Sequence, residues 1–269
     1  MRHASGPKRS PSDPLEETVA HTIVDLSELS AATGGSARLT GHLARPEGQG
    51  PWPGVVVVHE VFGSDEVMVR QAERLAEAGY LALLPDLYSD GGKRRCLVPT
   101  FLAMLSGRGR AHADIEAARR TLTARPDCTG AVGLIGFCMG GAFALLAANN
   151  GGYEAVSTNY GILPRDLDRA LADACPVVAS YGAHDRSLKG AAAKLDAALT
   201  RAGVPHDVKE YPEAGHSFLN DAENAPRLLR PLTRVANIGP EPEAAADAWA
   251  RIEAFFARHL KPGGRPRGG

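Results

Sequence analysis

From residue 136 to 141 the sequence reads GFCMGG, which places Cys138 between glycines two positions before and two positions after it. The stretch follows a short apolar run and opens an alanine-rich segment, the strand-turn-helix setting that presents a catalytic nucleophile on a sharp turn. Glycines at these positions avoid collisions across the turn. The amide of Met139 is left at a helix N-terminus, where it can donate to an oxyanion. A lone cysteine is more often an inert buried residue, but this pattern predicts a nucleophile at Cys138 and an oxyanion donor at Met139.

Two residues downstream of Cys138 have the types and placement of a base and its partner. Asp185 follows a β-rich run at 177–181, and His216 follows another at 207–211. Open α/β sheets collect functional residues at the carboxyl ends of their strands. Either residue alone fits an ordinary turn or surface loop, but the chain order of nucleophile, acid and histidine is that of a hydrolase triad. We therefore predict that His216 is the general base and that Asp185 orients it.

The loop after the β-branched run at 55–59 is expected to lie beside the nucleophile. In such an arrangement this loop supplies the second oxyanion donor, and the amide of Val61 is the candidate. The preceding residue, Glu60, is unusual there, because a carboxylate repels the negative charge that develops on the oxyanion. A solvated loop glutamate is the alternative interpretation of Glu60.

The elements that must position these residues alternate between β-rich and helical runs from residue 37 onward. Strands are predicted at 37–44, 55–59, 80–84, 131–135, 155–159, 177–181 and 207–211. Helices are predicted at 67–78, 111–124, 139–148, 190–201 and 243–260. Residues 90–109 are less regular and are expected to form a loop and a short helix over the end of the sheet. The alternation indicates an α/β fold, with a mostly parallel central sheet and helices on both faces.

The length of 269 residues fits a single α/β domain, which we place at residues 21–261. Residues 1–20 carry proline, serine and charge without an apolar core segment, so they are expected to be a disordered leader and not a secretory signal. The Pro/Gly/Arg-rich tail at 262–269 is expected to be disordered as well.

Bulk composition argues against several classes of function. A formal net charge of −1 provides no overall field for nucleic acid or an anionic membrane, and no apolar run is long enough to span a bilayer. The four cysteines form no CxxC pair and no zinc-type spacing, so neither a metal nor an organic cofactor is expected. Few, unpatterned cysteines indicate a reducing, cytoplasmic setting. We expect a monomer or small homo-oligomer whose partner is a small molecule.

Five stretches together resemble the dienelactone hydrolase family of α/β-hydrolases, carboxymethylenebutenolidase-like enzymes, over residues 38–260. They are HEVFG at 59–63, LPDLY at 84–88, GFCMGG at 136–141, the Asp185 loop and GHSF at 215–218. The resemblance implies that Cys138, His216 and Asp185 form a triad that opens an ester or lactone through a thioester acyl-enzyme. It also implies that Glu60 contacts the resting thiol and moves when substrate binds, which protects the cysteine from oxidation between turnovers.

The resemblance is incomplete at the substrate contacts. Family members that act on dienelactone hold the substrate carboxylate with two arginines, one after the Pro-Asp-Leu-Tyr motif and one after the catalytic histidine. Here residues 89–90 read Ser-Asp and residues 219–220 read Leu-Asn. The basic residues at 93–95 could replace the missing cations, although a solvated basic loop explains them equally well. The candidate substrate-binding residues are Arg94, Arg95, Phe62 and Tyr88.

Other functions stay open beside a dienelactone hydrolase-like activity. The missing arginines favour a general carboxylesterase or thioesterase with a wider pocket. A catalytically silent binding protein on the same scaffold is the second alternative. A redox role for Cys138 has less support, because no resolving cysteine is near it in the sequence.

Overall fold

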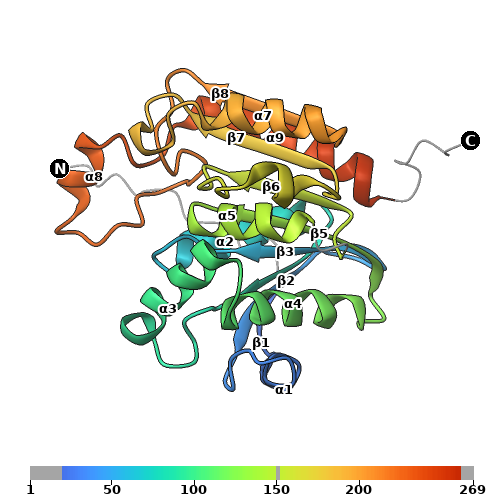
Figure 1. Ribbon diagram of the computed structural model, residues 1–269. Coiled ribbons are helices and arrows are strands. Elements are labelled where there is room, and N and C mark those ends of the chain that lie inside the picture. Colours follow the sequence, from blue (N-terminus) through green and yellow to red (C-terminus); the bar gives the residue numbers. More distant parts are fainter. Residues whose placement is uncertain (1–19, 150–151, 262–269) are drawn as a thin grey trace, which may run out of the picture.

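A computed structural model describes residues 20–149 and 152–261, in which one eight-stranded sheet runs through the middle of the molecule (Figure 1). The strand order is β1-β2-β4-β3-β5-β6-β7-β8. The strands are β1 (Ala20–Asp25), β2 (Thr40–Arg45), β3 (Trp52–Val58), β4 (Leu81–Pro85), β5 (Cys128–Phe137), β6 (Ala155–Asn159), β7 (Val177–Gly182) and β8 (His206–Tyr211). β2 pairs antiparallel with β1 and β4, and every other neighbouring pair is parallel, so the sheet is mostly parallel as predicted.

Helices cover both faces of the parallel strands. The helices concerned are α2 (Glu66–Glu77), α4 (Arg110–Thr123), α5 (Met139–Ala148), α7 (Ala191–Ala202) and α9 (Pro242–Leu260). From β3 to β4 the chain moves toward the β1 edge of the sheet, whereas from β4 to β8 it moves toward the β8 edge. Because crossover connections between parallel strands are right-handed, α2 lies on one face of the sheet and α4, α5 and α7 lie on the other. α9 joins α2, because Arg74 packs over the Trp249 ring at 4.7 Å. The valines at 55–58 are fully buried, as expected for a strand covered on both sides.

The parallel strands bring the chemistry-bearing loops to one edge of the sheet. Because β3 to β8 share a direction, the segments that follow them all emerge at their carboxyl ends. Residues 59–63 follow β3, Cys138 follows β5, Asp185 follows β7 and His216 follows β8. The sheet therefore sets the relative positions of the residues singled out in the sequence.

Each strand and helix predicted from the sequence is present, with ends displaced by up to three residues. The largest displacements are in the strands predicted at 37–44, 55–59 and 131–135, which begin at Thr40, Trp52 and Cys128. Five short elements have no counterpart in the prediction. They are β1, α1 (Ser27–Ala31), α6 (Leu167–Leu171), the 3-10 helix η1 (Arg186–Leu188) and α8 (Arg230–Val235). Each is too short to show a clear hydrophobic period.

The prediction of a loop and short helix at 90–109 is wrong in length. The segment forms α3 (Lys93–Ser106), a helix of 14 residues that includes Pro99. Glycines with positive φ bound it, Gly92 at 76° and Gly107 at 67°. Apolar residues occur on all sides of α3, so its sequence lacks the one-sided pattern by which helices are recognised.

Some expectations fall partly or wholly outside the described residues. The leader at 1–20 and the tail at 262–269 do so, except that Ala20 begins β1.

Among the helices that the structure describes, none is long and apolar enough to cross a bilayer. Within residues 20–149 and 152–261, no three His, Cys, Asp or Glu side chains gather in a way that could hold a metal ion.

Candidate active site

Cys138 lies on the turn between β5 and α5, in a backbone conformation that L-residues rarely adopt. Its φ is 54° and its ψ is −113°, a region that costs on the order of 1–3 kcal/mol and persists only where the surroundings enforce it. The neighbouring glycines let the turn close. A Cβ on Gly136 would lie 2.0 Å from the Gly140 carbonyl oxygen, and one on Gly140 would lie 2.1 Å from that of Val58. The strand-turn-helix setting inferred for Cys138 is thus present.

Asp185 and His216 meet across the ends of β7 and β8. Asp185 Oδ2 lies 2.5 Å from His216 Nδ1. The other carboxylate oxygen accepts hydrogen bonds from the amide and the hydroxyl of Ser187, at 3.0 and 2.6 Å. The Asp185 side chain is 4% exposed. Three donors therefore fix this carboxylate, and its orientation in turn fixes the imidazole.

His216 is hydrogen-bonded to Asp185 through Nδ1, and the Cys138 thiol is near enough to affect the pKa of the imidazole. Burial by itself lowers the pKa of His216, but its interactions with Asp185 and Cys138 outweigh burial and raise the pKa to about 10. Burial pushes the pKa of Asp185 upward, yet hydrogen bonds from His216 and Ser187 hold it below its ordinary value. Because Nδ1 is engaged by the carboxylate, Nε2 is the nitrogen left for the sulfur.

The segment after α8 holds the loop that carries His216. The His216 amide donates to the Asn237 carbonyl at 2.9 Å, and the Gly239 amide donates to the His216 carbonyl at 2.9 Å. Together these bonds form an isolated parallel bridge between His216 and Ile238. The chain that leaves β8 and forms α8 thus returns to make backbone hydrogen bonds with His216, the candidate base.

The two candidate oxyanion donors belong to Val61, in the loop after β3, and Met139, the first residue of α5. A first-turn amide has no acceptor within its own helix. Tyr88, a candidate substrate-binding residue, ties the two segments together. Its hydroxyl donates to the Val61 carbonyl at 3.1 Å and lies 4.0 Å from Met139 Sδ. Burial is the main cause that raises the pKa of Tyr88, so the phenol keeps the proton that it donates.

His59 is not one of the predicted site residues, yet it sets the orientation of the Val61 amide. His59 Nε2 accepts from the Leu87 amide at 3.2 Å, and Nδ1 lies 2.7 Å from the Glu60 carbonyl oxygen. Since Nε2 accepts, Nδ1 carries the proton and donates it. The Glu60 carbonyl and the Val61 N–H belong to one planar peptide, so fixing the first aims the second in the opposite direction. Burial lowers the pKa of His59 and keeps the ring neutral.

Tyr160, the residue after β6, is a second site residue that sequence reasoning missed. Its ring packs against that of His216 with centroids 5.0 Å apart, and its φ is 43°. Its hydroxyl is buried and makes no hydrogen bond that meets normal geometry within the described residues. Burial, and then the charges of Glu60 and Cys138, raise the pKa of Tyr160. Its place at the carboxyl end of a predicted parallel strand is the signal that could have identified it.

Glu60 is a buried carboxylate without a cationic partner in the part of the chain that the structure describes. Its Oε2 accepts hydrogen bonds from the side-chain amides of Asn220 at 3.2 Å and Asn224 at 2.8 Å. Its Oε1 is buried with no hydrogen-bond partner among the described residues, so the bond to Cys138 implied by the family resemblance is not made here. The charges of the Glu60 carboxylate and the Cys138 thiol nevertheless both raise the pKa of the Tyr160 phenol, after burial as the main cause.

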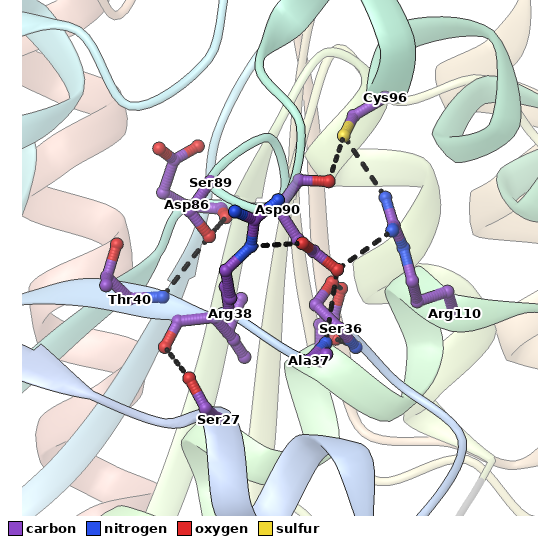
Figure 2. Close-up of polar contacts among 12 residues, drawn as sticks. Ser27, Ser36, Ala37, Arg38, Thr40, Asp86, Ser89, Asp90, Cys96 and Arg110 are labelled. Carbon is purple, nitrogen blue, oxygen red and sulfur yellow. Dashed lines mark hydrogen bonds and ion pairs between the residues drawn. The ribbon is translucent and has the colours of Figure 1, made fainter.

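Neither position at which the family resemblance predicts an arginine holds a cation. Asp90 is engaged by two arginines from elsewhere, Arg38 at 3.0 Å and Arg110 at 3.4 Å, and Figure 2 shows it between them. Asn220 donates to Glu60 instead. These two positions therefore provide no positive charge for a substrate carboxylate.

The candidate replacements lie in the first turn of α3. Arg94 and Arg95 are exposed there, and their side chains make no ion pair or hydrogen bond with the described residues. Lys93 is the cation that touches the oxyanion loop. Its Nζ lies 4.6 Å from the centroid of the Phe62 ring and 3.4 Å from the Phe62 carbonyl oxygen. Burial lowers the pKa of Lys93.

Comparison with known proteins identifies the family. Residues 39–260 match the family model described as the dienelactone hydrolase family. A carboxymethylenebutenolidase from Pseudomonas putida is 30% identical over 192 residues, which cover 66% of this chain and 80% of that protein. A dienelactone hydrolase-like promiscuous phosphotriesterase from metagenomic libraries has 27% identity and a TM-score of 0.74, over 90% of this chain and 100% of that one.

Dienelactone hydrolase from Anabaena variabilis has the same fold, with a TM-score of 0.64 at 21% identity over 91% of this chain and 100% of that one. The family match spans most of the residues that the structure describes, including the whole parallel part of the sheet. The chain therefore belongs to the dienelactone hydrolase family and is a hydrolase of esters or lactones built on the α/β-hydrolase fold.

Proposed function

We propose that this hydrolase cleaves its substrate with Cys138 as nucleophile, His216 as general base and Asp185 as the residue that orients the base. The observation that carries the proposal is the hydrogen bond between the Asp185 carboxylate and the His216 imidazole, beside the strained turn that presents the Cys138 thiol. The turn is followed by the free first amide of a helix.

In the first half of the reaction, once substrate is bound, the proton of Cys138 Sγ moves to His216 Nε2, as the raised pKa of His216 favours, and the sulfur attacks the ester or lactone carbonyl carbon. The carbonyl oxygen becomes an oxyanion, which the amides of Val61 and Met139 stabilise. Removal of one such donor typically costs about 3 kcal/mol of transition-state stabilisation. The C–O bond then breaks while His216 returns the proton to the leaving alkoxide, and the acyl group stays on sulfur as a thioester.

In the second half, His216 takes a proton from water, and the resulting hydroxide attacks the thioester. The acid is released and the thiol is restored. Asp185 keeps the proton of His216 on Nδ1 and stabilises the imidazolium that forms in each half. When the substrate is a lactone, the leaving alcohol stays attached to the acyl group, so ring closure competes with hydrolysis.

The proposal also gives Glu60 a role, as a carboxylate that interacts with the Cys138 thiol in the resting enzyme and moves when substrate binds. Support comes from its free Oε1 and from the neutral Asn220 and Asn224 amides that hold Oε2, since these bonds anchor one oxygen and leave the other available. A buried negative charge beside the cysteine disfavours the thiolate until substrate binds.

The nucleophile is tested with Cys138→Ala and, as a matched control on the same strand-turn segment, Cys128→Ala. We expect wild type and the control to hydrolyse p-nitrophenyl acetate and to carry one acetyl group on Cys138 by mass spectrometry of quenched enzyme. Cys138→Ala is expected to lose both turnover and the adduct while keeping its circular dichroism spectrum. Undiminished turnover would refute the role of Cys138, and failure of wild type to acylate with a panel of activated esters would favour a silent binding protein.

A general carboxylesterase or thioesterase is the second candidate function. The observation that favours it is the lack of a cation at the two carboxylate-binding positions, since Asp90 and Asn220 stand there. Paired ester substrates with and without a free carboxylate separate the candidates. A preference for the carboxylate-bearing member would support dienelactone hydrolase activity and would make Lys93, Arg94 or Arg95 the binding group.

A further inference from the structure

Exposed apolar side chains are concentrated in three segments of the molecule. Of the eleven large hydrophobic side chains that are exposed among the described residues, four lie on α3, one follows β6 and four lie at 228–235. We call these nine residues the apolar rim: Val98, Phe101, Leu102, Leu105, Ile162, Leu228, Leu229, Leu232 and Val235. The other two, Ile23 and Leu29, belong to β1 and α1. Single exposed hydrophobics are ordinary, but a gathering of this kind marks an interaction surface.

The apolar rim lies at the edge of the sheet that carries the active site. α3 follows β4, Ile162 follows β6 and α8 follows β8, and all three strands run parallel to β5, which ends at the Cys138 turn. Figure 1 shows α3 and α8 projecting on the same side of the molecule. The α8 segment is also continuous with the bridge that braces His216.

The exposed outer face of α3 is the clearest sign that this edge of the sheet binds a partner. The inner face of α3, with Cys96, Thr100, Ala103 and Met104, is buried against the domain. Its outer face carries rim residues at positions 98, 101, 102 and 105, spaced to form one stripe, and Leu102 and Leu105 are 57% and 59% exposed. A helix that is apolar on all sides is normally buried on all sides. The outer stripe therefore lacks its covering partner.

Positive charge accompanies the apolar rim. No acidic residue occurs at 91–113 or at 224–240. Six cations in or beside the rim segments are exposed and make no ion pair with the described residues. They are Lys93, Arg94, Arg95, Arg108, Arg165 and Arg227. The whole-chain charge of −1 hides this local excess, because it averages the rim with acidic surface elsewhere.

The apolar rim continues into a hollow that reaches the nucleophile helix. Leu105 and Ile162 line a cavity of about 370 Å³ together with Ala142 and Leu146 of α5. Ala142 stands one helical turn beyond Cys138. Arg165, Asp166 and Arg169 also line this cavity, two cations and one carboxylate. An apolar chain that enters from the rim would thus run beside the helix that carries the nucleophile, with cations available to an anionic head group.

We infer that the apolar rim docks this enzyme on an anionic lipid surface. Leucine and phenylalanine flanked by lysine and arginine are the composition of segments that lie in the head-group region of anionic bilayers. A second copy that met this face with the same face would bring the two sets of cations together, which disfavours that arrangement. The inference concerns peripheral contact only and does not depend on the identity of the nucleophile.

Cosedimentation of the purified protein with vesicles tests the inference. We expect binding to phosphatidylcholine vesicles that contain phosphatidylglycerol to exceed binding to pure phosphatidylcholine vesicles at least tenfold, and to fall as salt is added. Leu102→Glu/Leu105→Glu and Leu228→Glu/Leu232→Glu are each expected to lower that binding by roughly tenfold or more. Arg108→Gln/Arg227→Gln is expected to lower it by roughly thirtyfold, at about 1 kcal/mol for each cation near the surface.

Ile23→Glu/Leu29→Glu is the matched control, because it adds the same charges to the two exposed hydrophobics outside the rim. Its vesicle binding is expected to equal that of wild type, and circular dichroism reports that each variant is folded. Wild-type protein that does not bind the anionic vesicles, or rim variants that bind as well as the control, would overturn the inference. Dimers that dissociate in the rim variants without any vesicle binding would assign the rim to a second copy instead.

Discussion

His59 offers a sharp test of how the oxyanion loop is positioned. Its two ring nitrogens make different bonds, Nδ1 to the Glu60 carbonyl and Nε2 from the Leu87 amide. Asparagine places its amide nitrogen near the position of Nδ1, and glutamine places its amide oxygen near that of Nε2. His59→Asn therefore keeps the bond that holds the Glu60–Val61 peptide, whereas His59→Gln keeps only the bond to Leu87.

The two variants are expected to lose similar stability and very different activity. Each leaves one buried backbone group without its partner, which costs roughly 1–3 kcal/mol in the free energy of unfolding. In His59→Gln the side chain no longer holds the Glu60 carbonyl, so the Val61 amide loses its orientation toward the oxyanion. Loss of one oxyanion donor lowers kcat by about 10²–10³. KM changes little, because that amide acts mainly on the transition state. His59→Asn is expected to retain kcat within about threefold.

Steady-state hydrolysis of p-nitrophenyl acetate, with urea unfolding of the same preparations, measures both quantities. A kcat that falls equally in both variants would mean that His59 acts through stability alone. A kcat that survives in His59→Gln and falls in His59→Asn would refute the argument that the Glu60 carbonyl is what the ring holds. His59→Leu, which removes both bonds, is expected to combine the kcat of the glutamine variant with a larger loss of stability.

Three further outcomes are expected from the same geometry. Asp185→Asn lowers kcat by orders of magnitude, on the order of 10⁴ for the same change in a serine-histidine-aspartate triad; a normal rate would transfer the role to another carboxylate. Because folding raises the pKa of His216 from 6.5 to about 10, its stabilising contribution is complete below pH 6.5 and is lost as the pH rises through 10. Urea unfolding of wild type and His216→Gln against pH measures this, and parallel curves would contradict it. Glu60→Gln removes the negative charge beside the thiol, so iodoacetamide is expected to alkylate Cys138 roughly tenfold faster in the absence of substrate, with Asp65→Asn as control; an unchanged rate would end the proposed role of Glu60.

The residues that sequence reasoning found are those with local signals. Cys138 is marked by glycines that the closed turn requires, as the 2.0 Å and 2.1 Å approaches at Gly136 and Gly140 show. Asp185 and His216 are marked by chain order and by the strands before them, and β7 and β8 do bring them within hydrogen-bonding distance. A parallel sheet converts such order into proximity, because the carboxyl ends of its strands meet at one edge.

The residues that it missed depend on neighbours remote in the sequence. His59 acquires its role from the Leu87 amide on the loop after β4, and Tyr160 acquires its role from the His216 ring. Neither contact leaves a pattern in the surrounding residues. Arg94 and Arg95 are the opposite case, because their position in the sequence suggested a role in substrate binding and both are exposed. Position along the chain does not determine whether a side chain points toward the site or into solvent.

The same reasoning explains why the apolar rim is invisible in bulk numbers. A net charge of −1 and an ordinary apolar fraction describe sums over the chain, whereas a lipid surface responds to what one face presents within a Debye length. α3 and the segment at 228–235 are separated by more than a hundred residues, and only the parallel sheet brings them to the edge that also carries Cys138 and His216. If the rim binds lipid, one feature of the fold sets both the geometry of the chemistry and the surface from which an apolar ester would reach it.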